Sequence, residues 1–585
     1  MKTITIEHLA RVEGNGGVTA TIDGNKVTGV KFFINEAPRL IERLTIGKTP
    51  EEDVNLVPRI CAICTLSHKY AVLRAMERAL GVNVPPKVTL LRDLMHLGEM
   101  IESHSLHTYL LALPDYLGFP NAIAMASKHP FETKIALEMK QFGNHIMATM
   151  SGRFIHGENP VIGGFGKCPS RDELIWIKNR ALQFMPFVLK TAKIFAELPY
   201  PDSPEAETQY ACCNPGDGKY GFVGDEIILS SGEIIDAQDY RTLTHEYVVS
   251  HSYCKRSLYK GKPYSVGALA RVNNLGERLD GEAGKAFKKY FGPRWKKNPL
   301  FNNAAQALEL LYSFERIASV IEEALKLPDP GLVRYTKTAG KGVGAVEAPR
   351  GTLFHYYEIT KGRVSFCDII TPTAQNADDI ERYCYLAAQE LLDAGKEDDI
   401  RDRMDLVIRS YDPCISCSVH LTEVSKAPED NWREQLSKIP HGQLPIFIGL
   451  GVTSRSDDGV GAQLALALRE SGFKDAWLEP EPAAKDLCQP GYSSRPIIFI
   501  DALDFGERPG RIAFFPLRQA AWNSGLSHRL SPFLGAGLTY AQLENSYLLG
   551  IQPESLEEGD RLSEPVRKAL ERVLDEIKHR PAWRS

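Results

Sequence analysis

The spacing of apolar residues predicts a mainly helical chain up to about residue 400. Residues 1–35 alternate apolar and polar positions around the turn sequences GNGG and DGNK, which is typical of a small antiparallel sheet. Strand-like pieces between residues 200 and 300 indicate a second small β region. We therefore expect a mostly α bundle with small peripheral β-sheets. Its long stretches with a helical period are 87–113, 130–150, 170–197, 302–326 and 376–395.

The pattern changes after residue 444. LPIFIGLGV and RPIIFIDALDFG have the composition of buried strands, and the helical pattern PVRKALERVLDEIKH follows near the end of the chain. This alternation predicts a three-layer α/β domain over residues 445–585. Residues 421–444 are polar and contain proline, as linkers do. We thus expect a first domain over 1–420, a linker over 421–444 and a second domain.

Composition excludes several classes of partner. The net charge of −5 provides no electrostatic attraction for nucleic acid or an anionic membrane. The chain has no uninterrupted apolar run of about 18 residues, so we expect no membrane span. It starts without a secretory signal, and 11 cysteines in so long a chain do not suggest a disulfide framework. We expect a cytoplasmic protein.

Two C-x-x-C pairs are the main chemical signal. Cys61 and Cys64 lie in RICAICTLSH, and Cys414 and Cys417 lie in DPCISCSVH. Two such pairs predict thiolate ligands for a metal, although a redox dithiol, incidental core cysteines or a structural zinc site could use the same residues. Most of a large domain separates the pairs, which favours a functional metal over a structural one. Thiolates suit soft or borderline metals, and zinc would also satisfy them.

Together, the motifs RxCxxCxxxH and DPCxxCxxH resemble those of the large subunit of nickel–iron hydrogenases. The resemblance covers about residues 1–420 and is most similar in detail to the cytoplasmic, cofactor-coupled hydrogenases. Ala62 stands where this family normally has glycine. Four further fragments agree in order, namely RVEG at 11–14, IERLTIGK at 41–48, EAPRG at 347–351 and ITPTAQN at 370–376.

The resemblance implies a nickel ion held by all four cysteines. Cys64 and Cys417 would also bind an iron that carries cyanide and carbon monoxide, while Cys61 and Cys414 would bind nickel alone. The reaction implied is the heterolytic oxidation or evolution of H2, with H2 and protons as substrates.

Three further residues match family positions at this centre. Arg350 and Thr373 match positions that face the diatomic ligands. Cys414 would accept the proton first, with Arg350 as a competing base, and Glu13 would relay it to the exterior. A guanidinium stays protonated in almost any environment, which favours the thiolate as the acceptor.

The resemblance also implies a second metal and further protein subunits. Glu42, the carbonyl of Ile369 and His420 match a structural site for magnesium or iron, and hard oxygen ligands suit magnesium. No ferredoxin-like cysteine run occurs in the chain, so an iron–sulfur small subunit must carry the electrons. Further cofactor-reducing subunits are compatible with the resemblance.

The C-terminal part has a resemblance of its own, to hydrogenase maturation endopeptidases over about residues 445–577. Asp458, Asp501 and His528 match the three nickel-sensing ligands of that family. Two carboxylates and an imidazole could bind a divalent metal by their chemistry alone, whereas Asp458 could instead simply cap the following helix. The resemblance implies cleavage after His420. A non-catalytic subunit of a respiratory complex and an unprocessed metal-assembly precursor are the alternative functions.

Overall fold

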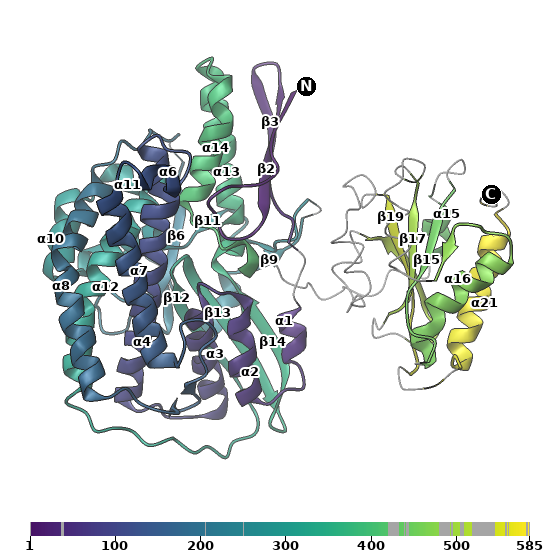
Figure 1. Ribbon diagram of the computed structural model, residues 1–585, viewed down its shortest axis with the longest axis horizontal. Coiled ribbons are helices and arrows are strands. Elements are labelled where there is room, and N and C mark those ends of the chain that lie inside the picture. The colour runs from purple at the N-terminus through teal and green to yellow at the C-terminus, as the bar shows by residue number, and fades with distance from the viewer. Residues whose placement is uncertain are drawn as a thin grey trace. The chain divides into compact units, whose positions relative to one another are not determined.

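In the computed structural model the chain forms two compact units, Met1–His420 and Leu421–Ser585 (Figure 1). In unit 1 the structure describes residues 2–418 except 37–39, 205 and 250. In unit 2 it describes residues 432–437, 439, 444–454, 456–478, 492, 495–503, 508–517, 545–555, 559, 561–580 and 583.

Long helices form most of unit 1, and they lie within a few residues of the stretches predicted from hydrophobic spacing. Helices α4, α7, α8 and α12 run side by side, and α4 continues into a π-helical turn at His107–Ala112 (Figure 1). A Cβ on Gly143 of α7 would lie 2.6 Å from the carbonyl oxygen of Gly98 in α4, so glycines allow these two backbones to touch. The bounds are α4 (Pro86–Leu106), α7 (Pro130–Ser151), α8 (Arg171–Ala196), α12 (Asn302–Ala324) and α13 (Pro372–Asp393).

An antiparallel sheet of three strands, β12 (Gly340–Ala348), β13 (Gly351–Thr360) and β14 (Arg363–Ile370), carries helix α3 (Thr65–Leu80). Glycines at alternate positions of β12 face the helix, and a Cβ on Gly344 would lie 2.0 Å from the oxygen of Ala71. The helix therefore packs directly on the strand. Hydrophobic spacing did not predict this sheet.

The other sheets of unit 1 are small, as expected. Strands β1 (Lys2–Ile6), β2 (Gly16–Asp23) and β3 (Lys26–Ile34) form the predicted antiparallel sheet. Four short strands between residues 209 and 265 form the sheet β11–β6–β7–β8. These four are β6 (Gln209–Asn214), β7 (Glu226–Leu229), β8 (Ile234–Asp236) and β11 (Tyr264–Ser265). Further helices of unit 1 include α1 (Ile41–Thr45), α2 (Pro50–Leu56), α9 (Ala268–Leu275) and α14 (Ile400–Ser410).

The described residues of unit 2 form a five-stranded sheet with the order β16–β15–β17–β19–β18, and among these strands only β18 is antiparallel to its neighbour. A Cβ on Gly461 would lie 2.1 Å from the oxygen of Ile500, so α16 starts tightly against the ends of β15 and β17. The strands are β15 (Ile446–Gly449), β16 (Ala476–Trp477), β17 (Ile497–Ala502), β18 (Ile512–Pro516) and β19 (Ser546–Ile551), and the α-helices within the described residues are α15 (Trp432–Ser437), α16 (Val460–Glu470) and α21 (Glu564–Lys578).

All three helices share one hydrophobic cluster with one face of this sheet. Trp432 and Leu436, which lie in the stretch expected to be a linker, are buried in that cluster. The three-layer arrangement stays a prediction, since residues 518–544 are outside the described part of unit 2.

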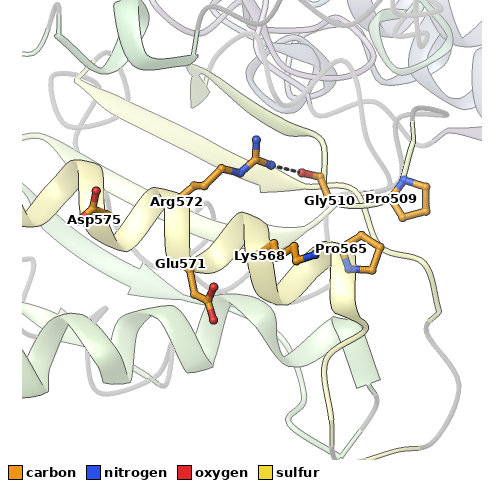
Figure 2. A pocket seen from close by; sticks show the side chains of 7 residues that line it. All are labelled: Pro509, Gly510, Pro565, Lys568, Glu571, Arg572 and Asp575. Carbon is orange, nitrogen blue, oxygen red and sulfur yellow. Dashed lines mark hydrogen bonds between the residues drawn. The ribbon is translucent and has the colours of Figure 1, made fainter.

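A surface pocket of unit 2 lies between Pro509–Gly510 and helix α21, where Arg572 donates a hydrogen bond to the Gly510 oxygen (Figure 2). Its charged side chains carry both signs, and none of the predicted site residues lines it.

No helix in the described part of the chain combines the length and the apolar composition needed to cross a membrane.

Candidate metal centre

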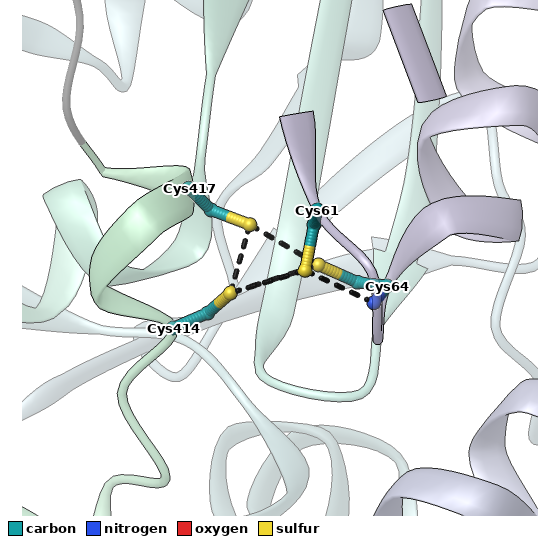
Figure 3. A group of neighbouring side chains, drawn as sticks. All are labelled: Cys61, Cys64, Cys414 and Cys417. Carbon is teal, nitrogen blue, oxygen red and sulfur yellow. Dashed lines mark hydrogen bonds between the residues drawn. The ribbon is translucent and has the colours of Figure 1, made fainter. Parts of the chain in front are cut away.

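Four thiols from opposite ends of unit 1 meet in one buried group. The Sγ atoms of Cys61 and Cys414 lie 3.3 Å apart, those of Cys64 and Cys417 lie 3.2 Å apart, and all four are within 4.8 Å of one another (Figure 3). None of the four residues is more than 3% exposed. The structure thus brings together the two predicted pairs.

The first pair is positioned by the start of helix α3. Cys61 has extended backbone angles, while Cys64 is the residue immediately before the helix and donates its N–H to the Cys61 sulfur at 3.2 Å. The N-terminus of a helix stabilises negative charge, which favours thiolates at this place. Ala62, between them, has an exposed side chain.

The second pair lies in a short turn held from two sides. The hydroxyl oxygen of Thr373, in the first turn of α13, accepts a hydrogen bond from the Cys414 N–H at 2.9 Å. On the other side, the carbonyl of Glu13 accepts from the Ile415 N–H at 3.0 Å. The Glu13 carboxylate also accepts hydrogen bonds from the N–H and the hydroxyl of Ser416. Thr373 and Glu13 therefore both contact the loop that carries Cys414.

Arg350 is the cation of the site. It lies in the turn between β12 and β13, is 3% exposed, and donates to the carbonyl oxygen of Asp412 at 2.9 Å and to its carboxylate at 3.0 Å. Burial opposes the charge, but the negative charges of Asp412 and of the nearby thiols outweigh it, so the pKa of Arg350 lies well above its ordinary value. Asp412 has a φ of 51°, a left-handed conformation that aspartate tolerates better than most residues.

The electrostatics of the thiols fit a metal cation. Burial, followed by the closeness of the other sulfurs, raises the pKa of Cys414 well above the ordinary value, because several thiolates cannot share one buried site unaided. Burial also raises the pKa of Cys417 well above the ordinary value, although its bond to Cys414 opposes this shift. A bound divalent metal removes this penalty and deprotonates its thiol ligands. Four converging buried sulfurs beside a cation therefore fit soft or borderline metals such as nickel.

Two of the three residues predicted for a structural metal lie together. The Ile369 N–H donates to the Glu42 carboxylate at 2.8 Å. Burial raises the pKa of Glu42 to about 7, and the positive charge of Lys255 opposes this shift. The third residue, His420, lies outside the described residues.

In unit 2, Asp501 is the second-last residue of β17, and Asp458 lies in the turn before α16, where it contacts the loop that follows the neighbouring parallel strand β15. Strand β15 has β16 on one side and β17 on the other, so the chain order reverses between β15 and β17, the usual place for ligands in open α/β sheets. Asp458 accepts a hydrogen bond from the Val452 N–H at 2.7 Å. Gly459, rather than Asp458, directly precedes helix α16. The third predicted ligand, His528, lies outside the described residues.

Sequence reasoning missed the partners of the site residues. Asp412 binds Arg350, and Ser416 binds Glu13, although both lie inside the recognised DPCISC stretch. Because Asp412 and Ser416 are each within two residues of Cys414 in the sequence, their position could have indicated that they lie at the site. In unit 2, Asp457, the residue before Asp458, was also missed. It is buried and its carboxylate accepts hydrogen bonds from the N–H groups of Glu554 and Ser563, whereas Asp458 is more exposed.

Comparisons with known proteins agree on one family. Residues 39–134 and 232–420 match the family described as nickel-dependent hydrogenase. The chain is 40% identical over 422 residues to the alpha chain of sulfhydrogenase 1 from Pyrococcus furiosus, covering 72% of this chain and 98% of the relative. It is 34% identical over 420 residues to one of the subunits of the F420-non-reducing hydrogenase vhu from Methanococcus voltae, covering 67% and 99%.

The fold is similar to that of solved hydrogenases. The match to an NAD+-reducing [NiFe]-hydrogenase in the H2-reduced state has a TM-score of 0.66 at 27% identity and covers 72% of this chain and all of that one. A [NiFeSe]-hydrogenase from Dm. baculatum has the same fold at a TM-score of 0.59 and 22% identity, with the same coverage.

Proposed function

Because this chain belongs to the nickel-dependent hydrogenase family, we propose that unit 1 is the catalytic subunit of a nickel–iron hydrogenase and that unit 2 is its maturation endopeptidase. The convergence of four buried thiols from the two ends of unit 1 is the observation that carries the first half of this proposal. The position of Asp501 at the carboxyl end of β17, and the hydrogen bond of Asp458 to the loop after the neighbouring strand β15, support the second half.

Nickel and iron with cyanide and carbon monoxide ligands are consistent with this family and with the four-cysteine group. In our proposal all four cysteines hold nickel, and Cys64 and Cys417 also hold the iron. When bound, the two metals supply the Lewis-acid and redox chemistry that heterolytic cleavage of H2 requires.

The chain's own residues handle the proton. The Cys414 thiolate accepts it first, since the raised pKa of Arg350 keeps the guanidinium protonated and unsuited to act as a base. Arg350 instead provides fixed positive charge and hydrogen-bond donors beside the reacting atoms. Glu13 takes the proton next, which is supported by its hydrogen bonds to Ser416, two residues after Cys414.

Electrons leave through partners. We propose an iron–sulfur small subunit, with cofactor-reducing subunits beyond it, in the cytoplasm. The names of the relatives support this, since they denote single subunits, such as the beta subunit of an NAD-reducing hydrogenase from Cupriavidus necator.

In unit 2, Asp458, Asp501 and His528 bind nickel that unit 1 has received, and the domain then cuts after His420. The released end of unit 1 brings His420 to Glu42 and the carbonyl of Ile369, and these three residues hold magnesium or iron. Glu42 and Ile369 are already neighbours, which supports this step.

The test is elemental analysis and infrared spectroscopy of the purified chain, combined with its intact mass. We expect nickel, iron, bands of bound cyanide and carbonyl, and an end at His420. A chain without nickel or these bands contradicts the hydrogenase assignment and favours a non-catalytic subunit. A persistent 65.1 kDa species in nickel-replete, active cells contradicts the peptidase assignment and favours an unprocessed precursor.

A further inference from the structure

A second arginine, Arg271 on helix α9, contacts the backbone next to Arg350 and has no role in the proposed chemistry. It is fully buried. Its Nε and Nη2 donate to the two carboxylate oxygens of Glu309 at 2.6 Å each, and its Nη1 donates to Glu347 at 2.8 Å. The remaining bonds, both of 3.1 Å, go to the carbonyl oxygens of Ala348 and Pro349. A guanidinium has five N–H groups, so every donor of Arg271 is used.

The two carbonyls belong to the residues directly before Arg350. They form the turn between β12 and β13, in which Ala348 pairs with Gly351. Gly351 has a φ of +138°, and a Cβ there would lie 2.4 Å from a methyl group of Val266. Arg271 therefore binds the first half of this turn, at Ala348 and Pro349. The second half, at Gly351, packs against Val266 and Gly267, directly before α9.

The charges around Arg271 fix its orientation. Glu309 also accepts hydrogen bonds from Tyr220 at 2.6 Å and from His104 at 2.8 Å. Burial would raise the pKa of Glu309, but the charge and hydrogen bonds of Arg271 lower it to about 2, so this acid is ionised. A buried charge without its partner is costly, so the guanidinium has no alternative position among these groups.

On the far side of the turn, the Arg350 side chain is held by Asp412 and donates to the Ser103 hydroxyl at 3.4 Å. Arg271 thus holds the backbone of the turn, and the turn places the side chain of Arg350 beside the thiols. We propose that Arg271 is a positioning residue that fixes the 348–350 turn and thereby the place of the Arg350 guanidinium. The proposal rests on the role of Arg350 in the proposed function.

Lysine cannot replace Arg271. It keeps the charge, but a lysine ammonium has three donors at one point, whereas the five acceptors around Arg271 match the planar fork of a guanidinium. In Arg271→Lys the turn loses backbone contacts, and a displacement of a catalytic group by about 1 Å lowers turnover by about 10–100-fold. We also expect shifted infrared bands of the bound cyanide and carbonyl, at unchanged nickel and iron content.

The decisive experiment is a double-mutant cycle of Arg271→Lys and Arg350→Lys in the matured complex. If Arg271 acts through Arg350, Arg271→Lys lowers turnover by about 10–100-fold in the wild-type background, but by no more than about 2-fold once Arg350 is lysine. Arg278→Lys, which removes a more exposed guanidinium bonded to Asn214, is the matched control and leaves the bands unchanged.

Equal losses in both backgrounds, or wild-type bands in Arg271→Lys, overturn the proposal. Should Arg271→Lys not fold, Thr352→Val replaces it. The Thr352 hydroxyl donates to Glu347 at 2.6 Å, so its loss loosens the same acid more mildly, and Thr352→Ser restores the bond. If the wild-type chain lacks the infrared bands of bound cyanide and carbonyl, the proposed function and the inference both fail. If the wild type shows these bands but the two substitutions lower turnover additively, the inference alone fails.

Discussion

The sulfur atoms of Cys61 and Cys414 lie 3.3 Å apart, although 353 positions separate the two residues. Bringing such remote segments together costs chain entropy, and contacts between thiols offset little of it. The loop of Cys414 is instead held by Thr373 and by the backbone of Glu13. Hydrogen bonds from the protein itself therefore help to position the Cys414 loop beside the first cysteine pair.

Replacing Cys414 with alanine tests the metal centre. We expect at least about 100-fold weaker nickel binding, since a ligand matters at least as much as the groups around it, and no detectable H2 uptake. Nickel content by elemental analysis and dye-linked H2 uptake measure the two effects. Cys168→Ala is the control, because this half-buried thiol lies outside the group of four, and it retains both properties. Uptake that persists in Cys414→Ala contradicts the assignment.

Replacing Glu13 with glutamine tests the proton route. The amide oxygen still accepts a hydrogen bond from Ser416, but it cannot carry a proton. We expect turnover to fall by about 100-fold or more, with the infrared bands preserved. Hydrogen–deuterium exchange between D2 and water measures the proton step directly. Glu36→Gln is the matched control, because Glu36 accepts a bond from the nearby Asn15 N–H. Equal exchange rates in the two variants would remove Glu13 from the route.

Replacing Asp458 with alanine tests unit 2. We expect the chain to remain at 65.1 kDa in nickel-replete cells that lack another maturation peptidase, because one of the proposed metal ligands is lost. Intact-mass spectrometry is the measurement. Glu470→Ala changes an exposed acid at the end of α16 and matures as the wild type does. Normal processing of Asp458→Ala would exclude the proposed ligand set.

The buried acid Asp53 predicts a pH-dependent stability. Its carboxylate oxygens have no hydrogen-bond partner among the described residues, and burial raises its pKa to about 8 from an ordinary 3.8. Between these pH values the folded state binds a proton that the unfolded state does not, so stability falls as pH rises. Asp53→Asn removes this dependence. We expect the difference in thermal midpoint between this variant and the wild type to be larger at pH 9 than at pH 5, by at least about 3 °C. Parallel melting curves across this range would contradict the raised pKa.

The contact between α4 and α7 predicts a steric effect. A methyl group on Gly143 would meet the Gly98 oxygen at 2.6 Å and the Glu102 nitrogen at 2.7 Å. We expect Gly143→Ala to lower the free energy of unfolding by about 1–3 kcal/mol, measured by chemical denaturation. The control is Gly29→Ala in β3, where the added Cβ meets no atom within 4 Å and stability is retained. An unchanged unfolding midpoint in Gly143→Ala would show that the helices can separate freely.

Local pattern predicted much of unit 1, since long helices such as α4 and α12 show their period in the chain itself. The sheet β12–β13–β14 was not predicted, because alternate glycines in β12 face a helix and interrupt the apolar pattern of the strand. The cysteine pairs were evident from their spacing. The pairing of Arg350 with Asp412 was not, because it joins residues 62 positions apart and depends on how the turn and the loop pack together.

The second cysteine pair lies close to the end of unit 1, and this affects the order of events during synthesis. At about 5–20 residues per second, a ribosome adds Cys414 about 20–70 s after Cys61. Throughout that interval a nickel ion would find only half of its sulfur donors on the growing chain. Translation itself therefore delays the loading of the metal until almost all of the hydrogenase unit has been made.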